Sequence, residues 1–181
     1  MNYYFSLDVE SIGLHGEAFA VGWSVLDETG EELDNGYVAI DPNLANGSDD
    51  DRQWVTENVI PHLPNPNIKD NFLMSPQKDM RELFWDDWMH WQSRGATLWA
   101  DCSWPVEARF LAACIDDEPE DRKWEGPYPL GEISSILLAA GKDPLANYDR
   151  LQSELPKHHP TCDARQSGRL LIEALKELTK K

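Results

Sequence analysis

The sequence has only three cysteines, Cys102, Cys114 and Cys162, and no CxxC pair. Such an odd, scattered set makes neither a disulfide framework nor a zinc ribbon, so a reduced compartment is its simplest account. No stretch approaches the eighteen or so apolar residues that cross a bilayer, and the opening MNYYFSLD lacks the basic start and cleavage site of a signal peptide. These absences predict a cytoplasmic protein without a membrane partner.

Basic residues are also scarce, with 16 Lys and Arg against 33 Asp and Glu and a formal net charge of -17. Nucleic-acid binding normally rests on Lys and Arg, so this balance would argue against such a partner. Clustered carboxylates weaken that argument, because a divalent cation that they bind attracts phosphate. Charge alone therefore leaves nucleic acid open as a partner.

Hydrophobic residues are plentiful, at 41% of the chain with eight Trp, which excludes a disordered chain. A length of 181 residues suits one domain with a full core, here residues 1–181. Periodicity predicts strands at 3–10, 19–27, 31–40 and 96–101, helices at 76–94, 105–114, 131–141 and 160–178, and loops at 41–51 and 116–130. The stretch WVTENVIPHLPNPN is expected to begin as a helix that its prolines end. Three strands followed by alternating helices and strands are typical of an α/β fold.

Two carboxylates stand at the end of the first predicted strand, in YFSLDVES. Alternation along the strand places Asp8 and Glu10 on one face and Phe5, Leu7 and Val9 on the other. Two such acids repel each other, and each loses solvation at the edge of a core. A bound cation would relieve both effects, although a strand end that emerges into water is the commoner reason for a short D-x-E match.

A second group of candidate ligands occurs near the C-terminus, in HHPTCDAR. Pro160 is well placed to open a helix that carries Asp163, and an acid on its first turns would reach a metal held by the first strand. His158 precedes this helix and would face the same site. Two alternatives are incidental surface histidines and a zinc site of His158, His159 and Cys162, whose spacing matches no familiar ligand set.

The middle of the chain supplies two further acids, in ADCSWPVEARFL. Asp101 ends the predicted strand, and Glu107 lies early in the following helix. Either would complete a carboxylate cluster. The alternatives are a turn residue for Asp101 and a favourable charge near a helix N-terminus for Glu107.

Together, D-x-E on the first strand, an acid after a middle strand and H-x4-D opening the last helix resemble the DEDDh branch of the 3′-to-5′ exonucleases. Within that branch the chain is most similar to the small exoribonucleases first described from mycobacteria, with WVTENVIPHLP, LWA and DAR as further points of resemblance. The resemblance implies a ribonuclease H-like mixed sheet with flanking helices. Its implied metal ligands are Asp8, Glu10, Glu107 and Asp163, with His158 as general base.

The middle motif departs from the family pattern, which has Asp where this chain has Glu107. Glu107 is preferred to its rival Asp101, because Phe110 and Leu111 fit the apolar pair that follows the family's acid. The resemblance also implies two Mg²⁺ or Mn²⁺ ions about 3.5 to 4 Å apart, bridged by Asp8. The expected reaction is release of 5′-mononucleotides from the 3′ end of single-stranded RNA or 3′ overhangs.

Two other functions stay open. The same fold would serve on DNA or short oligonucleotides, and a nucleic-acid-binding module would result if the altered middle motif has cost the chemistry. Trp104, beside the middle acid, is a candidate for base stacking. Arg165 and Lys157 flank the last motif and are candidates for phosphate contacts. Related exonucleases are often homodimers, which makes a homodimer a further expectation.

Overall fold

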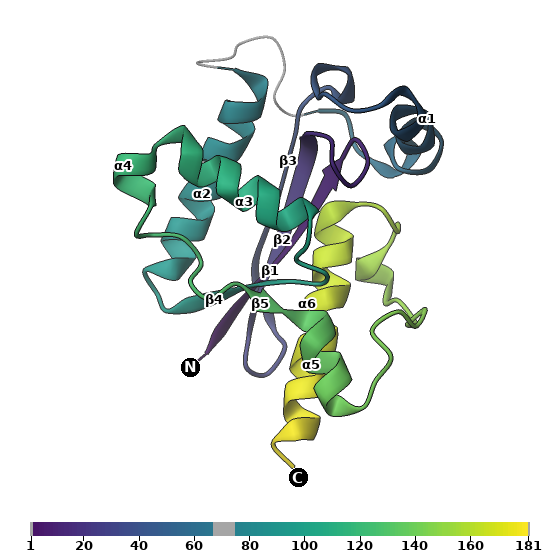
Figure 1. Cartoon of the computed structure of the whole chain (residues 1–181). Helices are drawn as coiled ribbons and strands as arrows, with labels where there is room; N and C mark the ends of the chain where they lie inside the picture. The colour runs from purple at the N-terminus through teal and green to yellow at the C-terminus, as the bar shows by residue number, and fades with distance from the viewer. Residues whose placement is uncertain (1, 67–74, 181) are drawn as a thin grey trace.

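A mixed sheet of five strands, in the order β3-β2-β1-β4-β5, forms the centre of the molecule (Figure 1). The computed structural model describes residues 2–66 and 75–180. The strands are β1 (Tyr3–Ser11), β2 (Ala18–Asp27), β3 (Glu32–Ala39), β4 (Ala96–Ala100) and β5 (Gly131–Glu132). β1 runs antiparallel to β2 and parallel to β4, so the sense of pairing changes at this central strand.

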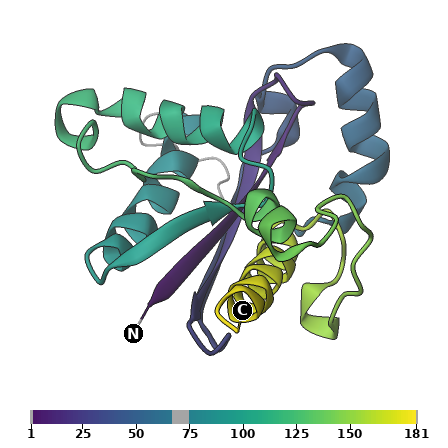
Figure 2. The same cartoon turned by 60° about the horizontal axis from the view of Figure 1, so that its bottom comes forward.

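Helices cover both faces of the sheet, with α2 and α3 on one side and α5 and α6 on the other (Figures 1 and 2). The α-helices of the described residues are α1 (Asp49–Asn58), α2 (Pro76–Gln92), α3 (Val106–Asp117), α4 (Pro119–Arg122), α5 (Ile133–Ala140) and α6 (Pro160–Leu178), and the 3-10 helices are η1 (Pro42–Leu44), η2 (Ile60–His62) and η3 (Gln152–Glu154). The result is a single-domain α/β fold, as the sequence predicts. Within residues 2–66 and 75–180, no helix has both the length and the apolar character to cross a membrane.

The larger core lies between the sheet and α2, and β1 supplies part of it with Phe5, Leu7 and Val9. Phe5 packs edge-on against Phe84 and Trp88 of α2, with ring centroids 6.0 and 5.6 Å apart. The helix predicted at 76–94 from apolar residues spaced four, four and three apart is confirmed, since those residues, Met80, Phe84, Trp88 and Trp91, are all buried. With these side chains filling one face, the alternate residues of β1 are directed to the face that α6 covers.

The observed elements differ from the prediction at three places. The expected loop 41–51 contains η1 and the start of α1, where the Ser48 side chain accepts from the backbone N–H of Asp51. The expected loop 116–130 contains α4. The segment expected to be helical from residue 131 begins with β5, which pairs with β4, and its helix starts at Ile133. The predicted range of the last helix, 160–178, is confirmed.

Candidate metal centre

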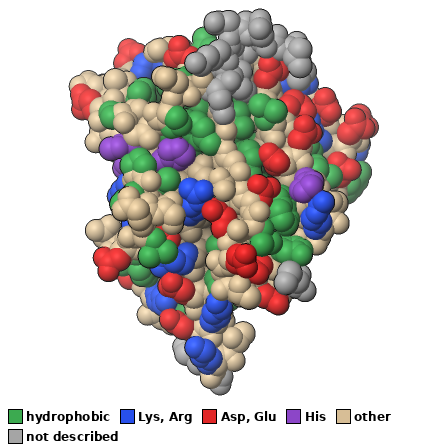
Figure 3. Space-filling model, turned by 180° about the vertical axis from the view of Figure 1, so that it is seen from behind, with side chains coloured by type: hydrophobic (Ala, Val, Ile, Leu, Met, Phe, Trp, Pro, Cys, Tyr) green, Lys and Arg blue, Asp and Glu red, His purple; other side chains and the backbone are tan. Residues whose placement is uncertain are grey.

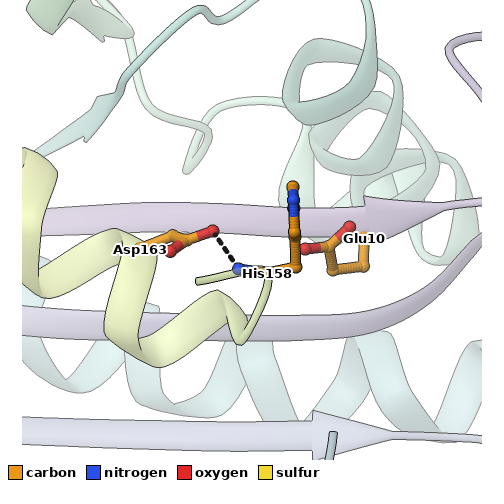
Figure 4. A group of neighbouring side chains, drawn as sticks. All are labelled: Glu10, His158 and Asp163. Carbon is orange, nitrogen blue, oxygen red and sulfur yellow. Dashed lines mark hydrogen bonds between the residues drawn. The ribbon is translucent and has the colours of Figure 1, made fainter. Parts of the chain in front are cut away.

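Acidic side chains from three elements, with one histidine, gather where β1 leaves the centre of the sheet. Glu10 lies on β1, Asp163 on the first turn of α6 and His158 just before that helix. A carboxylate oxygen of each acid and a ring nitrogen of His158 all lie within 4.8 Å of one another. In Figure 4 the imidazole stands between the two carboxylates. Residues that are about 150 positions apart in the chain thus share one site.

A glycine on β2 allows α6 to approach the carboxylates of β1. Gly22 is the register partner of Asp8, and a Cβ at Gly22 would lie 2.2 Å from the backbone N of Thr161. A side chain there would push the first turn of α6 away from the sheet. The close approach places Asp163, two residues further on, over the face that carries Asp8.

Asp163 is held by two donors. The Arg150 guanidinium donates to its Oδ1 at 2.5 Å, and the backbone N–H of His158 donates to its Oδ2 at 3.1 Å. The same nitrogen of Arg150 also donates to the carbonyl of Glu154 at 2.9 Å. His158 has a φ of +64°, a left-handed conformation that turns the chain into α6. The orientation of Asp163 is therefore set before any ligand arrives.

The His158 ring is partly enclosed by aromatic groups from α1 and η2. Trp54 meets it edge-on with centroids 5.9 Å apart, and the ring of His62 lies 6.3 Å away. Desolvation lowers the pKa of His158 below its ordinary 6.5, with the nearby charge of Asp163 acting in the opposite direction. The imidazole is therefore mainly neutral at pH 7, which is the form that accepts a proton.

Glu107, on α3, lies near Asp8 and Glu10. It enters at the point where the pairing of β1 with β4 ends. The last register pair of these strands is Leu7 and Ala100, and beyond it the backbone N–H of Val9 bonds to the Glu107 carboxylate. Glu107 is only 9% exposed, and burial raises its pKa to about 7. A cation bound nearby would therefore favour the ionised form of the Glu107 carboxyl.

The rival acid Asp101 lies further from the centre of the cluster. Its side chain is exposed, and one of its oxygens accepts from the Ser134 hydroxyl at 3.4 Å. Glu107 raises the pKa of both Asp8 and Glu10, whereas the effect of Asp101 on Asp8 is the smaller of the two. This arrangement favours Glu107 as the third acid of the cluster.

The carboxylates are short of positive charge. Desolvation, followed by repulsion from Glu10 and Asp163, raises the pKa of Asp8 well above its ordinary value. Burial and then the charges of Asp163 and Glu107 raise the pKa of Glu10 to about 8. Among the described residues, the ion pairs give this cluster one cationic partner, Arg150. Oxygen donors with uncompensated charge suit Mg²⁺ or Mn²⁺, so the donor set fits a divalent cation.

The remaining predicted residues lie at the periphery. The His159 ring packs against Tyr37 at 4.9 Å, and the Cys162 thiol donates to the carbonyl of Leu155, so neither points into the group that contains His158. This disfavours the zinc alternative. Arg165 is paired with Glu32 at 2.8 Å and is not a free cation, while Trp104 is 71% exposed.

Two neighbours of the site were missed in the sequence. Trp54 falls in a polar stretch whose residues show no apolar face, yet its 53% exposed ring borders His158. Arg150 lies thirteen residues before Asp163, outside any local motif. The stretch WVTENVIPHLP, which resembles the exonuclease family, was the only signal for Trp54.

Comparison with known proteins adds no assignment. No protein-family model matches the chain, and no curated protein matches it either. The function is therefore argued from the site.

Proposed function

We propose that the chain is a metal-dependent 3′-to-5′ exonuclease of the DEDDh type. The observation that carries the proposal is the meeting of Glu10, His158 and Asp163 within 4.8 Å, with Asp8 beside them. This is the set that the resemblance at the two ends of the sequence implies. Their identities, two acids from a strand and an H-x4-D pair from a helix start, are specific only in this combination.

The topology is compatible with the ribonuclease H-like fold that this activity implies. Three antiparallel strands precede two parallel ones, with β1 in the centre. The acids lie on the central strand and on a helix packed over it. An arrangement of this kind holds several carboxylates on rigid elements, as a metal site requires.

Asp8, Glu10, Glu107 and Asp163 are the residues that would hold Mg²⁺ or Mn²⁺. When bound, these ions provide an activated water and stabilise negative charge on the leaving oxygen. Oxygen donors with raised pKa values also predict that cation binding releases protons between about pH 7 and 8. Glu107 keeps its carboxylate in the cluster although it is one methylene longer than the Asp of the family.

His158 is the proposed general base. Its neutral ring would accept a proton from water as the water oxygen bonds to phosphorus and the bond from phosphorus to the 3′ oxygen breaks. The leaving 3′ oxygen takes up a proton from solvent, and His158 later returns its proton to solvent. The products are a 5′-mononucleotide and a strand shortened by one residue that ends in a 3′-hydroxyl. The exposed ring of Trp54 lies on the same side as His158 and is placed to stack on the terminal base.

Single-stranded RNA is the proposed substrate. In the view from behind, acidic side chains are spread over the surface and Lys and Arg are scattered among them (Figure 3). That face offers no extended basic track for duplex phosphates. A few local contacts to a strand end suit a protein with a net charge of -17. A homodimer stays a prediction.

The test is a gel assay on 5′-labelled single-stranded RNA and DNA with Mg²⁺, Mn²⁺ or chelator. We expect metal-dependent shortening from the 3′ end, faster on RNA, and its loss in Asp8→Asn. Shortening of DNA alone would reassign the sugar preference. Absence of shortening on every substrate would overturn the exonuclease proposal.

A binding module of the same fold is the second candidate, because Arg150 already neutralises Asp163 and the middle acid is Glu. It predicts oligonucleotide binding without shortening in every metal. The same assay, run beside a filter-binding measurement, separates the two candidates.

A further inference from the structure

An arginine neutralises one of the acids in the candidate metal centre. A guanidinium nitrogen of Arg150 lies 2.5 Å from Oδ1 of Asp163, and each side chain is only 16% exposed. The ion pairs formed within residues 2–66 and 75–180 include no other acid of the cluster. A divalent cation that takes Asp163 as a ligand therefore meets a positive charge on the same carboxylate.

The Arg150 nitrogen has a second acceptor, which lies outside the cluster. It also donates to the backbone carbonyl of Glu154, at 2.9 Å. The Glu154 side chain is buried and accepts from Arg169 of α6 at 2.6 and 3.0 Å and from the backbone N–H of Leu151 at 2.9 Å. These contacts fix η3 against α6, so the Glu154 carbonyl stays in place if Arg150 leaves Asp163.

Asp163 likewise has a contact that does not depend on Arg150. Its Oδ2 accepts from the backbone N–H of His158 at 3.1 Å (Figure 4). This donor carries no net charge, so a cation on Oδ1 does not repel it as it repels a guanidinium. The carboxylate can therefore exchange Arg150 for a metal ion while the start of α6 keeps its conformation.

Charge favours exchange over coexistence. A guanidinium and a divalent cation on one carboxylate repel each other, and the low exposure of Arg150 and Asp163 leaves little water to screen the repulsion. A metal ion contacts several carboxylates at once, whereas Arg150 bonds to one of them. The metal ion is therefore the stronger competitor, but its affinity is lowered by the cost of breaking the ion pair.

We propose that Arg150 is the internal counter-ion of this cluster, and that Mg²⁺ binds by displacing its guanidinium from Asp163 and leaving it on the carbonyl of Glu154. The inference rests on the proposed function in one respect, that this function requires the metal. Arg150 is a positioning residue, because it acts through Asp163 and not on the substrate. Its presence makes occupancy of the site depend on the free Mg²⁺ concentration more steeply than four unpaired carboxylates would.

The experiment measures Mg²⁺ binding by calorimetry, at constant ionic strength, for the parent protein and three variants. Arg150→Gln should bind Mg²⁺ about tenfold more tightly than the parent, because no ion pair has to be broken. Arg150→Lys should stay within about threefold of the parent, since Arg150 uses a single nitrogen for both contacts and an ammonium keeps the charge. The control Arg165→Gln breaks the 2.8 Å ion pair with Glu32 on the same helix, outside the cluster, and should also stay within about threefold. Unchanged or weaker binding in Arg150→Gln would overturn the displacement.

Thermal unfolding separates a counter-ion from a merely structural arginine. In chelator, the Tm of Arg150→Gln should lie about 2 to 4 °C below that of the parent, because the carboxylates lose their cation. Saturating Mg²⁺ should close most of this gap, since the metal then supplies the charge. Arg165→Gln should show the same deficit under both conditions. A deficit in Arg150→Gln that Mg²⁺ leaves unchanged would make Arg150 structural only.

The parent protein supplies a readout that needs no variant. Added Mg²⁺ should shift the ¹⁵N NMR signals of the Arg150 guanidinium and leave those of Arg165 in place. An Arg150 signal that saturating Mg²⁺ does not shift would also overturn the displacement.

A gel assay on single-stranded RNA separates this proposal from the function it rests on. Shortening of RNA with a Mg²⁺ affinity that ignores Arg150 would remove the counter-ion and keep the nuclease. Tighter Mg²⁺ binding in Arg150→Gln, with no shortening by the parent or any variant, would keep the counter-ion and remove the nuclease.

Discussion

The backbone N–H of His158 donates to Oδ2 of Asp163 across 3.1 Å (Figure 4). The proposed base and the last proposed ligand are thus joined through the main chain and not through the imidazole. Replacing the imidazole should leave this hydrogen bond in place. The φ of +64° at His158 decides which replacement is suitable, because Asn adopts the left-handed conformation more readily than Ala.

His158→Asn should therefore lower kcat by about 100-fold or more while Asp163 stays in position. The physical reason is the loss of the proton acceptor at the attacking water. The measurement is single-turnover cleavage of a labelled RNA, with the rise in Tm on adding Mg²⁺ as a report on metal binding. His90→Asn, an exposed change in α2, is the matched control. Retained turnover in His158→Asn would remove His158 from the mechanism.

Glu107→Gln and Asp101→Asn distinguish the two middle acids. Glu107 is buried, and its charge acts on both Asp8 and Glu10. The neutral amide of Glu107→Gln should therefore raise the Mg²⁺ concentration needed for half-maximal activity by about tenfold or more. A tenfold change corresponds to a loss of about 1.4 kcal/mol in the free energy of Mg²⁺ binding. Asp101→Asn should change that Mg²⁺ concentration by less than about threefold. The measurement is a Mg²⁺ titration of initial rates. The reverse order of the two variants would make Asp101 the ligand.

The stability of the metal-free protein should fall as the pH rises from about 4.5 to 8. The pKa of Glu10 is raised from 4.5 to about 8, so the folded state binds this proton more tightly than the unfolded state does. The contribution of protonated Glu10 to the free energy of unfolding is therefore fully present below pH 4.5 and is lost as the pH passes through 8. Glu107, raised to about 7, acts in the same direction.

Glu10→Gln tests this dependence, because the amide cannot ionise. In chelator at pH 8 its Tm should exceed that of the parent by about 2 to 4 °C, for a relief of about 1 kcal/mol, and the difference should vanish near pH 4.5. Mg²⁺ should then raise the Tm of the parent more than that of the variant. Glu57→Gln, exposed on α1, serves as control. Parallel pH curves for parent and Glu10→Gln would contradict the raised pKa.

Much of the fold follows from local pattern. Apolar residues recur at every second position of β1 and at every third or fourth position of α2. In each element they form one face, and both faces are buried in the larger core. Pro160 and the amphipathic spacing that follows it were enough to place α6. Such signals arise because one face of the element is buried, so that apolar residues recur at a fixed spacing in the sequence.

The parts that were missed depend on contacts between distant residues. The two residues of β5 are a strand only because β4 lies beside them, and α1 starts in an acidic run that carries no apolar stripe. The choice between Asp101 and Glu107 turns on where the ladder of β1 and β4 ends, which no spacing in the sequence records. Arg165 was a candidate for phosphate contacts in the sequence, but in the fold it forms an ion pair with Glu32 of β3.

Trp54 and Trp104 are both exposed, at 53% and 71%, and each is a candidate partner for a stacked base. Trp54 borders His158, so Trp54→Ala should weaken binding of single-stranded RNA by about 5-fold to 100-fold, the usual range for one stacked base. Trp54→Phe should recover most of that affinity, and homopolymers of different bases should be affected alike, because every base offers a π face. Fluorescence anisotropy of a labelled, uncleavable oligonucleotide in Mg²⁺ gives the affinities. If Trp104→Ala proves the more damaging change, the terminal base stacks on Trp104, beside the middle acid, and not on Trp54.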